Sequence, residues 1–367
     1  MTDADSGQEQ RALIALSMVP GVGAGRLRAL VAELGSAVAV LGATRRQIQR
    51  VPGIGRATAE AIAASHPEGD VEAQLRRAEQ VEADLVPAWS DTYPARLREI
   101  YDAPAFLWQR GTLGAADDQS IAIVGTRRPS RYGLNQARQF AAELVRQGFT
   151  VVSGLAYGID AAAHEGALDA GGRTLAVLGS GVDRIYPHRH VRLAHRILEA
   201  GALLSECALG AAPDAPNFPR RNRIVSGLTL GTLVVEAYEA GGALITARCA
   251  LEQNREVFAC PGDAGRPSSA GTNQLIQHGH AKLVQSVDDI LDELLLPSAN
   301  TAKSPAPAPD LPPNEQLVWD ALTDVPIHLD VLCRTAGIDP STALVRLLSL
   351  EFKGLVQQLG GKQFCRL

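Results

Sequence analysis

SIAIVGTRRPSRYG, which runs from Ser120 to Gly133, is the stretch of sequence that decides the fold. Its apolar run from Ile121 to Val124 predicts a buried strand, and a helical pattern begins near Tyr132. A glycine, a threonine and two arginines separate these elements, at positions Gly125, Thr126, Arg127 and Arg128. The free N–H groups of a helix start, the accessible backbone of a glycine and the forked guanidinium group all suit a phosphate. The G-x-G-x-x-G pattern of dinucleotide-binding loops is absent, so the segment predicts an arginine-bearing loop that faces a phosphate backbone.

Short β-type runs alternate with helical segments between residues 84 and 296. The predicted strands are Ile121–Val124, Thr150–Val152, Thr174–Leu178, Ala202–Leu204, Thr232–Val235, Glu256–Ala259 and Lys282–Val284. Helical stretches such as Asn135–Arg146 and Ile159–Leu168 lie between them. This alternation predicts an α/β fold with a Rossmann-like, doubly wound, mostly parallel sheet. Ligands of such sheets bind beyond the carboxyl ends of the strands, so the loops that follow the strands should share one site.

The net charge of the 367-residue chain is −5, so a nucleic-acid partner would require positive charge that is gathered locally. Three basic clusters follow predicted strands: Arg127, Arg128 and Arg131; Arg184, His188, Arg189, His190 and Arg192; and Arg220, Arg221 and Arg223. Any one cluster is also compatible with a solvated charged face. Because all three belong to one α/β segment, we expect their side chains to meet at one edge of the sheet.

Two of the loops carry further groups that suit a nucleic acid. Ser153 and Gly154 place a hydroxyl and an N–H at the end of the second strand, where phosphate contact and a plain tight turn are both compatible with the pattern. Phe218 precedes the arginines of the third cluster. A base can stack on such a ring while the charges follow the backbone, which is typical of single-strand binding. The alternative is that Phe218 fills the core beneath a helix start.

Residues 1–83 predict a helical domain that contains an internal near-repeat. Val19-Pro20-Gly21-Val22-Gly23 and Val51-Pro52-Gly53-Ile54-Gly55 precede the helical segments Ala24–Leu34 and Arg56–Ala64. The pattern is similar to a helix-hairpin-helix pair, in which the apolar residue between the glycines packs inward. Such hairpins contact duplex phosphates through their N–H groups, whereas a tight interhelical turn without DNA contact is the alternative. The candidate duplex-binding residues are Gly21, Gly23, Gly53, Gly55 and Arg56.

Residues 297–313, PSANTAKSPAPAPDLPP, predict a Pro- and Ala-rich linker. Residues 314–367 predict a winged-helix-like domain with three helices, Asn314–Leu322, Leu329–Ala336 and Pro340–Lys353, and a hairpin formed by Leu355–Gln358 and Gln363–Leu367 around Gly360-Gly361. The third helix of a winged helix often reads DNA, but here it is mostly apolar. We therefore favour protein docking or an accessory DNA role over sequence reading.

Motifs for catalysis are missing from the sequence, which has no G-x-S-x-G, Walker A or H-E-x-x-H segment. Five scattered cysteines without C-x-x-C spacing predict reduced thiols in a cytoplasmic protein. No apolar run approaches the roughly 20 residues of a membrane span, and the polar N-terminus is unlike a secretory signal. We expect no catalytic residues, no cofactor, no metal site and no membrane partner.

Six segments carry a family resemblance over about residues 90–290: IVGTRRPSRYG, VSGLAYGIDAAAH, GSGVDRIYP, NFPRRNRIVSGL, LVVEAYEAGGALITA and VFACPGDAGRPSSAGTNQLI. In their order and spacing the chain resembles the DNA-processing protein A (DprA/Smf) family. The resemblance implies an extended Rossmann-fold homodimer that binds single-stranded DNA in a basic pocket. It also implies that the protein protects incoming DNA and helps to load the RecA recombinase during natural transformation, without catalytic activity.

The candidate single-strand-binding residues combine the motif positions with the basic clusters. They are Gly125, Thr126, Arg127, Arg128, Ser153, Gly154, His188, Arg189, Phe218, Arg220, Arg221, Asn222 and Arg223. The sequence departs from the family pattern at Tyr157, where a basic residue is common, and at His188, where many members carry lysine. Arg189, beside His188, can take the place of that lysine.

An enzyme remains as the alternative hypothesis, namely a nucleotide phosphoribohydrolase with a related Rossmann core. Its signature is an unbroken P-G-G-x-G-T loop that leads to a catalytic glutamate. Here Pro261-Gly262-Asp263-Ala264-Gly265 lacks the second glycine, and Gly271-Thr272 comes late. Glu236, which follows an apolar strand, is a candidate for a lone base, although a helix-start or pocket-wall residue is the favoured alternative. The sequence favours the DNA-binding hypothesis.

Overall fold

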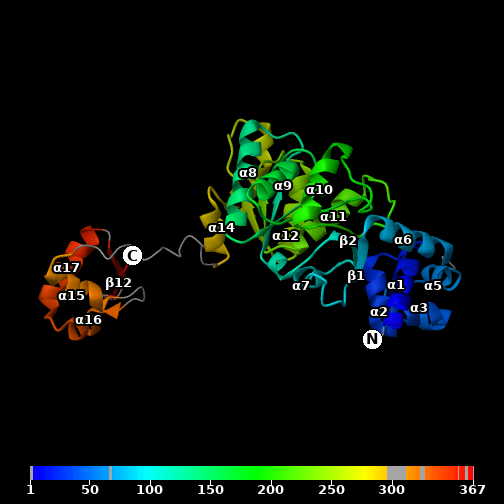
Figure 1. The fold of residues 1–367 in the computed structure, drawn as a ribbon, viewed down its shortest axis with the longest axis horizontal. Coiled ribbons are helices and arrows are strands. Elements are labelled where there is room, and N and C mark those ends of the chain that lie inside the picture. The colour runs from blue at the N-terminus through cyan, green and yellow to red at the C-terminus, as the bar shows by residue number, and fades with distance from the viewer. Residues whose placement is uncertain are drawn as a thin grey trace. The chain divides into compact units, whose positions relative to one another are not determined.

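The structure is a computed structural model that describes residues 3–65, 68–295, 311–322, 327–353, 355–359 and 363–366 (Figure 1). It divides into two compact units, Met1–Thr301 and Ala302–Leu367, which are described separately. Most of the predicted linker, residues 297–310, lies outside the described residues.

A nine-stranded sheet forms the centre of the larger unit, with the strand order β1-β2-β6-β5-β4-β3-β7-β8-β9. The strands are β1 Ala83–Pro87, β2 Phe106–Gly111, β3 Ser120–Val124, β4 Thr150–Ser153, β5 Thr174–Val177, β6 Ala202–Ser205, β7 Gly231–Val234, β8 Glu256–Ala259 and β9 Lys282–Leu283. From β6 to β9 in this order every pair is parallel, whereas β1 and β2 pair antiparallel at the edge. The predicted doubly wound, mostly parallel sheet is confirmed.

The sequence predicted seven of these strands and missed β1 and β2. The two missed strands lack the continuous apolar run that marks a buried parallel strand. Asp84 and Pro87 interrupt β1, and Gln109 and Arg110 occupy the second half of β2. Both become strands because β6 offers an edge on which β2 pairs, with Trp108 opposite Ser205 and Gly111 opposite Ala202.

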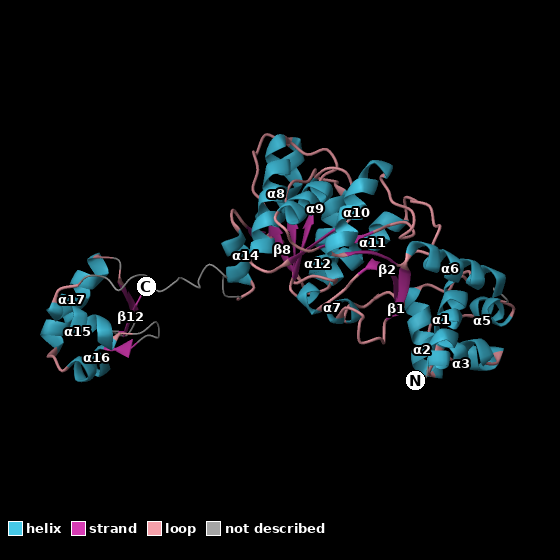
Figure 2. Ribbon diagram, viewed as in Figure 1, coloured by secondary structure: helices cyan, strands magenta, loops and turns pink. Residues whose placement is uncertain are grey.

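Helices cover both faces of the sheet (Figure 2). One face of the sheet packs against α8 Arg131–Arg146, α9 Ile159–Asp169, α10 Val191–Ala200 and α14 Val287–Glu293. The other face packs against α7 Ala95–Arg98, α11 Asn217–Gly227 and α12 Gly242–Glu252. A further helix, α13 Ala270–Gln277, follows β8. Alternate residues of β3 serve the two faces, since Ile121 and Ile123 join the cluster with α8 while Ala122 and Val124 join the cluster with α11 and α12. Strand order reverses beside β3, because the chain continues from β3 to β4 on one side and returns to β7 on the other.

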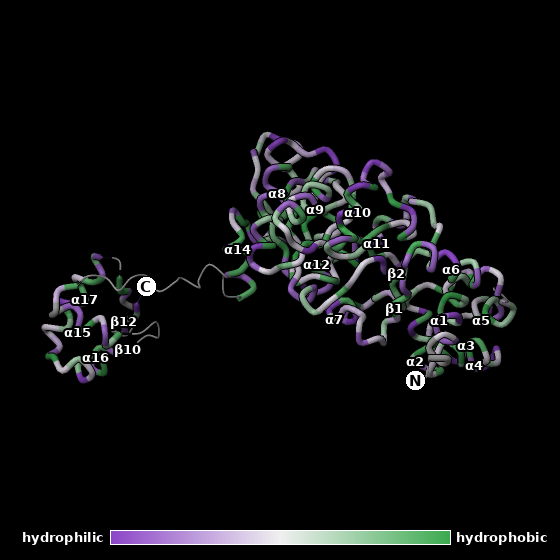
Figure 3. The backbone as a smooth tube through the Cα atoms, viewed as in Figure 1, coloured by the Kyte–Doolittle hydropathy of each residue, from purple (hydrophilic) through white to green (hydrophobic). Residues whose placement is uncertain are grey.

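The N-terminal helices are α1 Asp3–Ser17, α2 Ala24–Leu34, α3 Ala37–Gly42, α4 Arg45–Ile48, α5 Arg56–Ala63 and α6 Glu68–Val81. As predicted, the apolar residue between the glycines of each hairpin packs inward, and Val22 and Ile54 are both 7% exposed. This helical region shares a hydrophobic core with β2, whose Phe106 and Trp108 pack in the same cluster as Val22. Figure 3 shows hydrophobic segments inside the unit and hydrophilic segments mainly at its periphery, in loops and in outer helices such as α6.

Two polar contacts also hold the helical region against the α/β region. The side chain of Gln74 donates to the carbonyl oxygen of Leu209 at 3.0 Å, and its oxygen accepts from the Leu209 N–H at 2.8 Å. Arg77 lies 3.6 Å from the carboxylate of Asp183. The reciprocal amide pair is buried, so separating the two regions would leave the polar groups of Leu209 without partners.

The smaller unit has the predicted winged-helix arrangement. Its helices are α15 Pro313–Ala321, α16 Leu329–Ala336 and α17 Pro340–Phe352, and its strands β10 Ile327–His328, β11 Val356–Leu359 and β12 Gln363–Arg366 pair in the order β10-β12-β11. The predicted hairpin turn at residues 360 and 361 lies outside the described residues. The outer face of α17 is apolar, with Val345 and Phe352 at 71% and 85% exposure.

Candidate nucleic-acid interface

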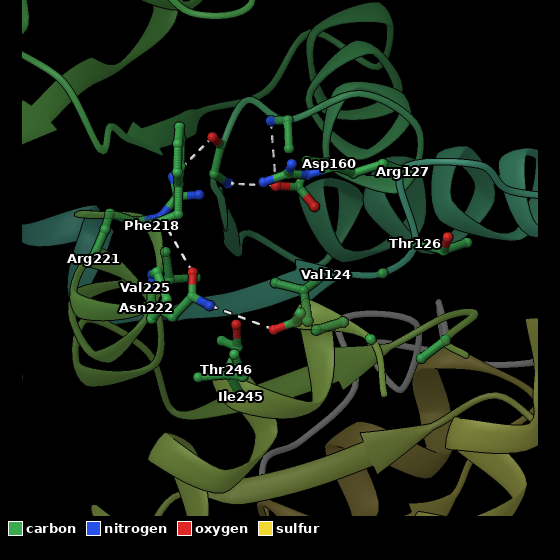
Figure 4. Close-up of a pocket in the computed structure, with 18 of the residues that line it drawn as sticks. Val124, Thr126, Arg127, Asp160, Phe218, Arg221, Asn222, Val225, Ile245 and Thr246 are labelled. Atoms are coloured by element: carbon green, nitrogen blue, oxygen red, sulfur yellow. Dashed lines mark hydrogen bonds between the residues drawn. The ribbon is translucent and has the colours of Figure 1, made fainter. Parts of the chain in front are cut away.

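A cavity of about 710 Å³ lies at the point where strand order reverses. Its walls come from the loops that follow β3, β4 and β7 and from the first turns of α11 and α12. Figure 4 shows Phe218, Arg221 and Asn222 on one side of this cavity and Thr126 and Arg127 on the other. We call it the switch-point cavity.

The loop after β3 is packed so closely that its first residue has room only for a glycine. A Cβ atom on Gly125 would lie 2.5 Å from Cγ1 of Ile159, and 2.9 Å from the carbonyl oxygen of Glu236. The N–H of Thr126 donates to that same carbonyl oxygen at 2.7 Å, and the Thr126 carbonyl accepts from the N–H of Ile159. The backbone that carries Arg127 is therefore held between the start of α9 and the end of β7.

The carboxylate of Glu236 fixes the other end of this loop. It accepts from the Ser130 N–H at 2.9 Å and from the Ser130 hydroxyl at 3.2 Å. Its second oxygen accepts from the hydroxyl of Ser268. Ser130 in turn caps α8 by accepting from the N–H of Gly133. Glu236 is only 2% exposed and does not line the switch-point cavity, so we assign it a positioning role in place of the lone-base alternative.

Arg127 and Phe218 form the part of the cavity best suited to an unpaired nucleotide. The guanidinium carbon of Arg127 lies 5.4 Å from the centre of the Phe218 ring, which is within cation–π range. Tyr186, which is 43% exposed, lies 5.8 Å from the same ring with an interplanar angle of 47°. Phe218 is half-buried, so it does not simply fill the core, which was the alternative to base stacking. It rests on Gly179, where a Cβ atom would lie 2.9 Å from the ring.

Arg221 forms the floor of the cavity as a buried cation. Its guanidinium donates to the carbonyl oxygens of Gly154, at 2.8 Å, and of Val177, which end β4 and β5. Burial lowers the pKa of Arg221 to about 10, which still leaves it charged at pH 7. Burial also raises the pKa of Asp160, and the positive charge of Arg221 opposes this rise. The Asp160 carboxylate accepts from the N–H groups of Gly154 and Ala156 at 3.2 and 3.3 Å.

Ser153 and Gly154 do not offer the open groups that the sequence predicted. The Ser153 hydroxyl is fully buried and donates to the carbonyl oxygen of Ile123 at 2.6 Å. The Gly154 N–H already donates to Asp160. Gly154 nonetheless lines the cavity, and it must be a glycine because a Cβ atom there would lie 2.3 Å from an Arg221 nitrogen.

The first and third basic clusters both reach the switch-point cavity but the second does not, so the predicted shared site is found only in part. Arg127 and Arg128 line the switch-point cavity, as does Arg221, but Arg223 does not. Arg223 instead pairs with Asp102 at 3.1 Å and with Glu206 at 2.5 Å. The reason is helical geometry: Phe218, Arg221, Asn222 and Val225 lie on one side of α11, whereas Arg220 and Arg223 lie on another.

His188 and Arg189 are exposed and lie outside the lining of the cavity. From their segment it is Tyr186 that reaches the site, together with Tyr238 and Ile245 from the β7–α12 region. Sequence reasoning missed these three residues. Tyr186 stood in the quoted segment GSGVDRIYP, and an aromatic residue beside a basic cluster was the signal that could have identified it.

The two hairpins of the N-terminal region differ in their surroundings. The tips of both carry a glycine with positive φ, +84° at Gly21 and +81° at Gly53. The exposed side chain of Arg56 pairs with Glu60 at 2.9 Å, and Arg45 contacts the same carboxylate. A Cβ atom on Gly53 or Gly55 would meet nothing within 4 Å, so the tip of the second hairpin faces open space. The same holds for Gly23 of the first hairpin, whereas a Cβ atom on Gly21 would lie 3.7 Å from the side chains of Arg26 and Thr58.

Among the residues that the structure describes, no group of His, Cys, Asp or Glu side chains is arranged to hold a metal ion. None of the helices described is both long and apolar enough to traverse a lipid bilayer.

The fold and the cavity define a doubly wound α/β protein with a cationic, aromatic-sided cleft and appended helix-hairpin-helix and winged-helix modules. Family models agree with each part. The model described as DNA recombination-mediator protein A matches residues 84–295, the DprA winged helix domain matches 302–362, and the SAM-like helix-hairpin-helix tandem matches 13–65. The chain belongs to the DNA recombination-mediator protein A family, which confirms the resemblance seen in its motifs.

Relatives and solved structures support this assignment. Protein Smf from Escherichia coli is 44% identical over 311 residues, which cover 81% of this chain and 81% of that protein. DNA processing protein DprA from Bacillus subtilis is 43% identical over 212 residues, which cover 58% of this chain and 71% of that protein. The X-ray structure of DprA from Streptococcus pneumoniae matches with a TM-score of 0.68 and 32% identity, over 80% of this chain and 98% of that one. DprA from Helicobacter pylori, whose structure concerns its single-stranded DNA binding mode, matches with a TM-score of 0.53 and 28% identity over 58% of this chain and 96% of that one.

Proposed function

We propose that this protein binds single-stranded DNA in the switch-point cavity and acts as a recombination mediator. The observation that carries the proposal is the Arg127–Phe218 pair at 5.4 Å, at the carboxyl edge of the sheet. A base can stack against Phe218 while Arg127 and Arg128 neutralise the adjacent phosphates. A duplex keeps its bases stacked on one another, so none of its bases is free to stack on the Phe218 ring. The single-strand binding mode described for the Helicobacter pylori relative supports this choice of ligand.

Within the cavity the residues have different roles. The Gly125–Thr126 backbone and Arg127 and Arg128 contact the phosphates, and Phe218 and Asn222 contact the bases. Arg221 supplies a fixed positive charge beneath the strand, since its hydrogen bonds are directed into the protein. His188 and Arg189, which are exposed and follow Tyr186 in the chain, extend the path of the strand beyond the cavity.

Membership in the family supports a proposal for the biological role. The protein protects incoming single-stranded DNA and helps to load the RecA recombinase onto it during natural transformation, in the cytoplasm. It forms a homodimer through the α/β unit and has no catalytic activity of its own. The membership in a recombination-mediator family supports this role, and RecA filament formation on oligonucleotides with and without the protein would test it. Sedimentation of the full chain would test the dimer.

The exposed tip of the second hairpin supports a secondary contact with duplex DNA. Gly53, Gly55 and the exposed side chain of Arg56 all face open space there. Hairpin N–H groups at such a tip can bind duplex phosphates, so substitution of Arg56 should weaken binding to duplex without changing the affinity for oligo-dT. Unchanged duplex binding would favour the alternative of a plain interhelical turn.

The main test compares oligo-dT with a duplex of equal length in a gel-shift assay of the full chain. We expect the single strand to bind more tightly, with a log–log salt slope of about −0.7 for each phosphate contacted. Phe218→Ala should weaken binding by about 1–3 kcal/mol, which corresponds to roughly 5- to 150-fold in Kd. Arg127→Ala should weaken binding and also make the salt slope shallower.

Arg146→Ala is the matched control for Arg127→Ala. Arg146 is an exposed arginine in the last turn of α8, whereas the Arg127 loop leads into the first turn of the same helix. Equal affinity for both forms of DNA, or equal effects of the Arg127 and Arg146 variants, would contradict the proposed site. Release of free base from AMP would instead revive the phosphoribohydrolase alternative.

A further inference from the structure

The first hairpin of the N-terminal region borders a cavity, although its Pro20, Gly21 and Gly23 are as exposed as their counterparts in the second hairpin. Residues Met18 to Ala24 form one wall of a second cavity of about 570 Å³. The opposite wall contains Cys207, Asn217, Arg220 and Arg221, from the end of β6 and the first turns of α11. We call this space the hairpin cavity.

The hairpin is held rigidly in this position. Val22 and Leu27 belong to the same buried cluster as Ala105 and Phe106 of the α/β region. The reciprocal hydrogen bonds between Gln74 and Leu209 join the same two regions. Because apolar burial and buried hydrogen bonds act together here, the hairpin is a permanent wall of the cavity.

The hairpin cavity adjoins the switch-point cavity at Arg221, which lines both. The first turn of α11 separates them: Phe218 and Asn222 face the switch-point cavity, whereas Asn217 and Arg220 face the hairpin cavity. A polymer that passes around the start of α11 would therefore enter one cavity on leaving the other.

The charges around the hairpin cavity suit a phosphate. Arg220 is exposed and, among the described residues, makes no hydrogen bond or ion pair. Glu206 also lines the cavity, but its carboxylate is paired with Arg223 at 2.5 Å. Arg223 itself is 8% exposed and keeps one buried guanidinium nitrogen without a partner, in a hollow that it shares with Arg220 and Ala24. Helix α2 also begins there, and no side chain caps its start at Gly23.

We propose that the hairpin cavity is a second subsite for the same single strand, and this inference rests on the proposed function. The strand leaves the switch-point cavity, passes the start of α11, and places the next phosphate between Arg220 and the uncapped start of α2. The apolar side chains of the hairpin wall cover the adjoining base. The two hairpins of the tandem thus have different ligands, since the first borders a single-strand path and the second remains open to other contacts.

The test compares two substitutions at equivalent positions of the repeat. Pro20→Glu places a carboxylate in the wall of the hairpin cavity, whereas Pro52→Glu places one on the exposed tip of the second hairpin. Both prolines are exposed and precede a glycine with positive φ, so the two changes strain the fold equally. Binding is measured for the full chain with oligo-dT of about 4 nucleotides, which fills one cavity, and of about 16 nucleotides, which can span both.

We expect Pro20→Glu to weaken binding of the longer oligonucleotide about tenfold, as loss of one charge-assisted phosphate contact would. The Kd for the shorter oligonucleotide should stay within about twofold of the wild-type value. Pro52→Glu should change neither. Arg220→Ala provides a second measurement, because it should reduce the salt slope of the longer oligonucleotide by about 0.7.

Equal affinities of the Pro20 and Pro52 variants for the longer oligonucleotide, with an unchanged salt slope for Arg220→Ala, would overturn the inference. A loss of duplex binding in both proline variants, with oligo-dT binding intact, would also overturn it in favour of paired duplex-binding hairpins. The proposed function fails separately, if the short oligonucleotide does not bind or does not respond to Arg127→Ala.

Discussion

Glu236→Gln should loosen the loop that carries Arg127 without removing any group that contacts DNA. The buried carboxylate accepts the N–H and hydroxyl of Ser130 on one oxygen and the hydroxyl of Ser268 on the other. A glutamine of the same shape keeps one acceptor oxygen and loses the negative charge. Hydrogen bonds to a charged group contribute about 1.5–3 kcal/mol and neutral ones about 0.5–1.5 kcal/mol. Since each of the three bonds then loses about 1 kcal/mol, we expect a destabilisation of about 3 kcal/mol.

Three measurements check this expectation. The Tm of the full chain should fall by roughly 5 °C. Hydrogen exchange measured by mass spectrometry should become faster in peptides that cover residues 125–130, because the Ser130 N–H loses its charged acceptor. The Kd for oligo-dT should rise between about three- and tenfold, because the loop no longer holds Arg127 in its DNA-binding position before the DNA binds.

Glu239→Gln is the matched control, since Glu239 lies three residues further along the same loop and is exposed. The control should behave as the wild type in all three measurements. The reasoning is refuted if Glu236→Gln and Glu239→Gln show the same exchange in residues 125–130 and the same Kd. A fall in Tm alone, without faster exchange in that segment, would show that Glu236 stabilises the core and does not position the loop.

Two further predictions concern the rest of the larger unit. Burial lowers the pKa of His164 to about 3, below the ordinary value of about 6.5 in an unfolded chain. As the pH falls below 6.5, His164 therefore binds a proton in the unfolded chain but not in the folded protein. By pH 5 this difference lowers the free energy of unfolding by about 2 kcal/mol. Urea unfolding at pH 7 and pH 5 should show this loss in the wild type and not in His164→Asn; an equal loss in both would exclude His164 as the cause. Gln74→Leu should destabilise the full chain by about 2 to 4 kcal/mol, because it leaves the buried N–H and C=O of Leu209 unpaired. A loss below about 0.5 kcal/mol in urea unfolding would show that this amide pair does not hold the helical region in place.

The pattern of apolar runs was sufficient to predict the parallel strands, because a strand buried on both faces carries a local signal. Strand β8, Glu256–Ala259, was predicted with its observed bounds, and the other six within two residues at either end. Edge strands carry no such signal. β1 contains Asp84 and Pro87, and it becomes a strand only through pairing with β2.

The residues of the candidate site were partly predictable. Gly125, Arg127 and Phe218 lie in the segments that the motifs identified, and all three line the switch-point cavity. The local sequence could not show which way each side chain of a helical segment points. Arg221 and Arg223 are two positions apart, and one lies under the cavity while the other pairs with Glu206 on another side of α11.

The sequence by itself determined the fold class, the family and the loops that surround the site, because these depend on local patterns and on the order of motifs along the chain. Tertiary structure alone decided which groups remain available to a ligand. Ser153 and Gly154 are occupied because their partners, Ile123 and Asp160, come from elements brought next to them by folding. In the same way, the first hairpin borders a cavity and the second does not because only the first packs against the end of β6 and α11. Similar local sequences acquire different surroundings, and the surroundings decide what they can bind.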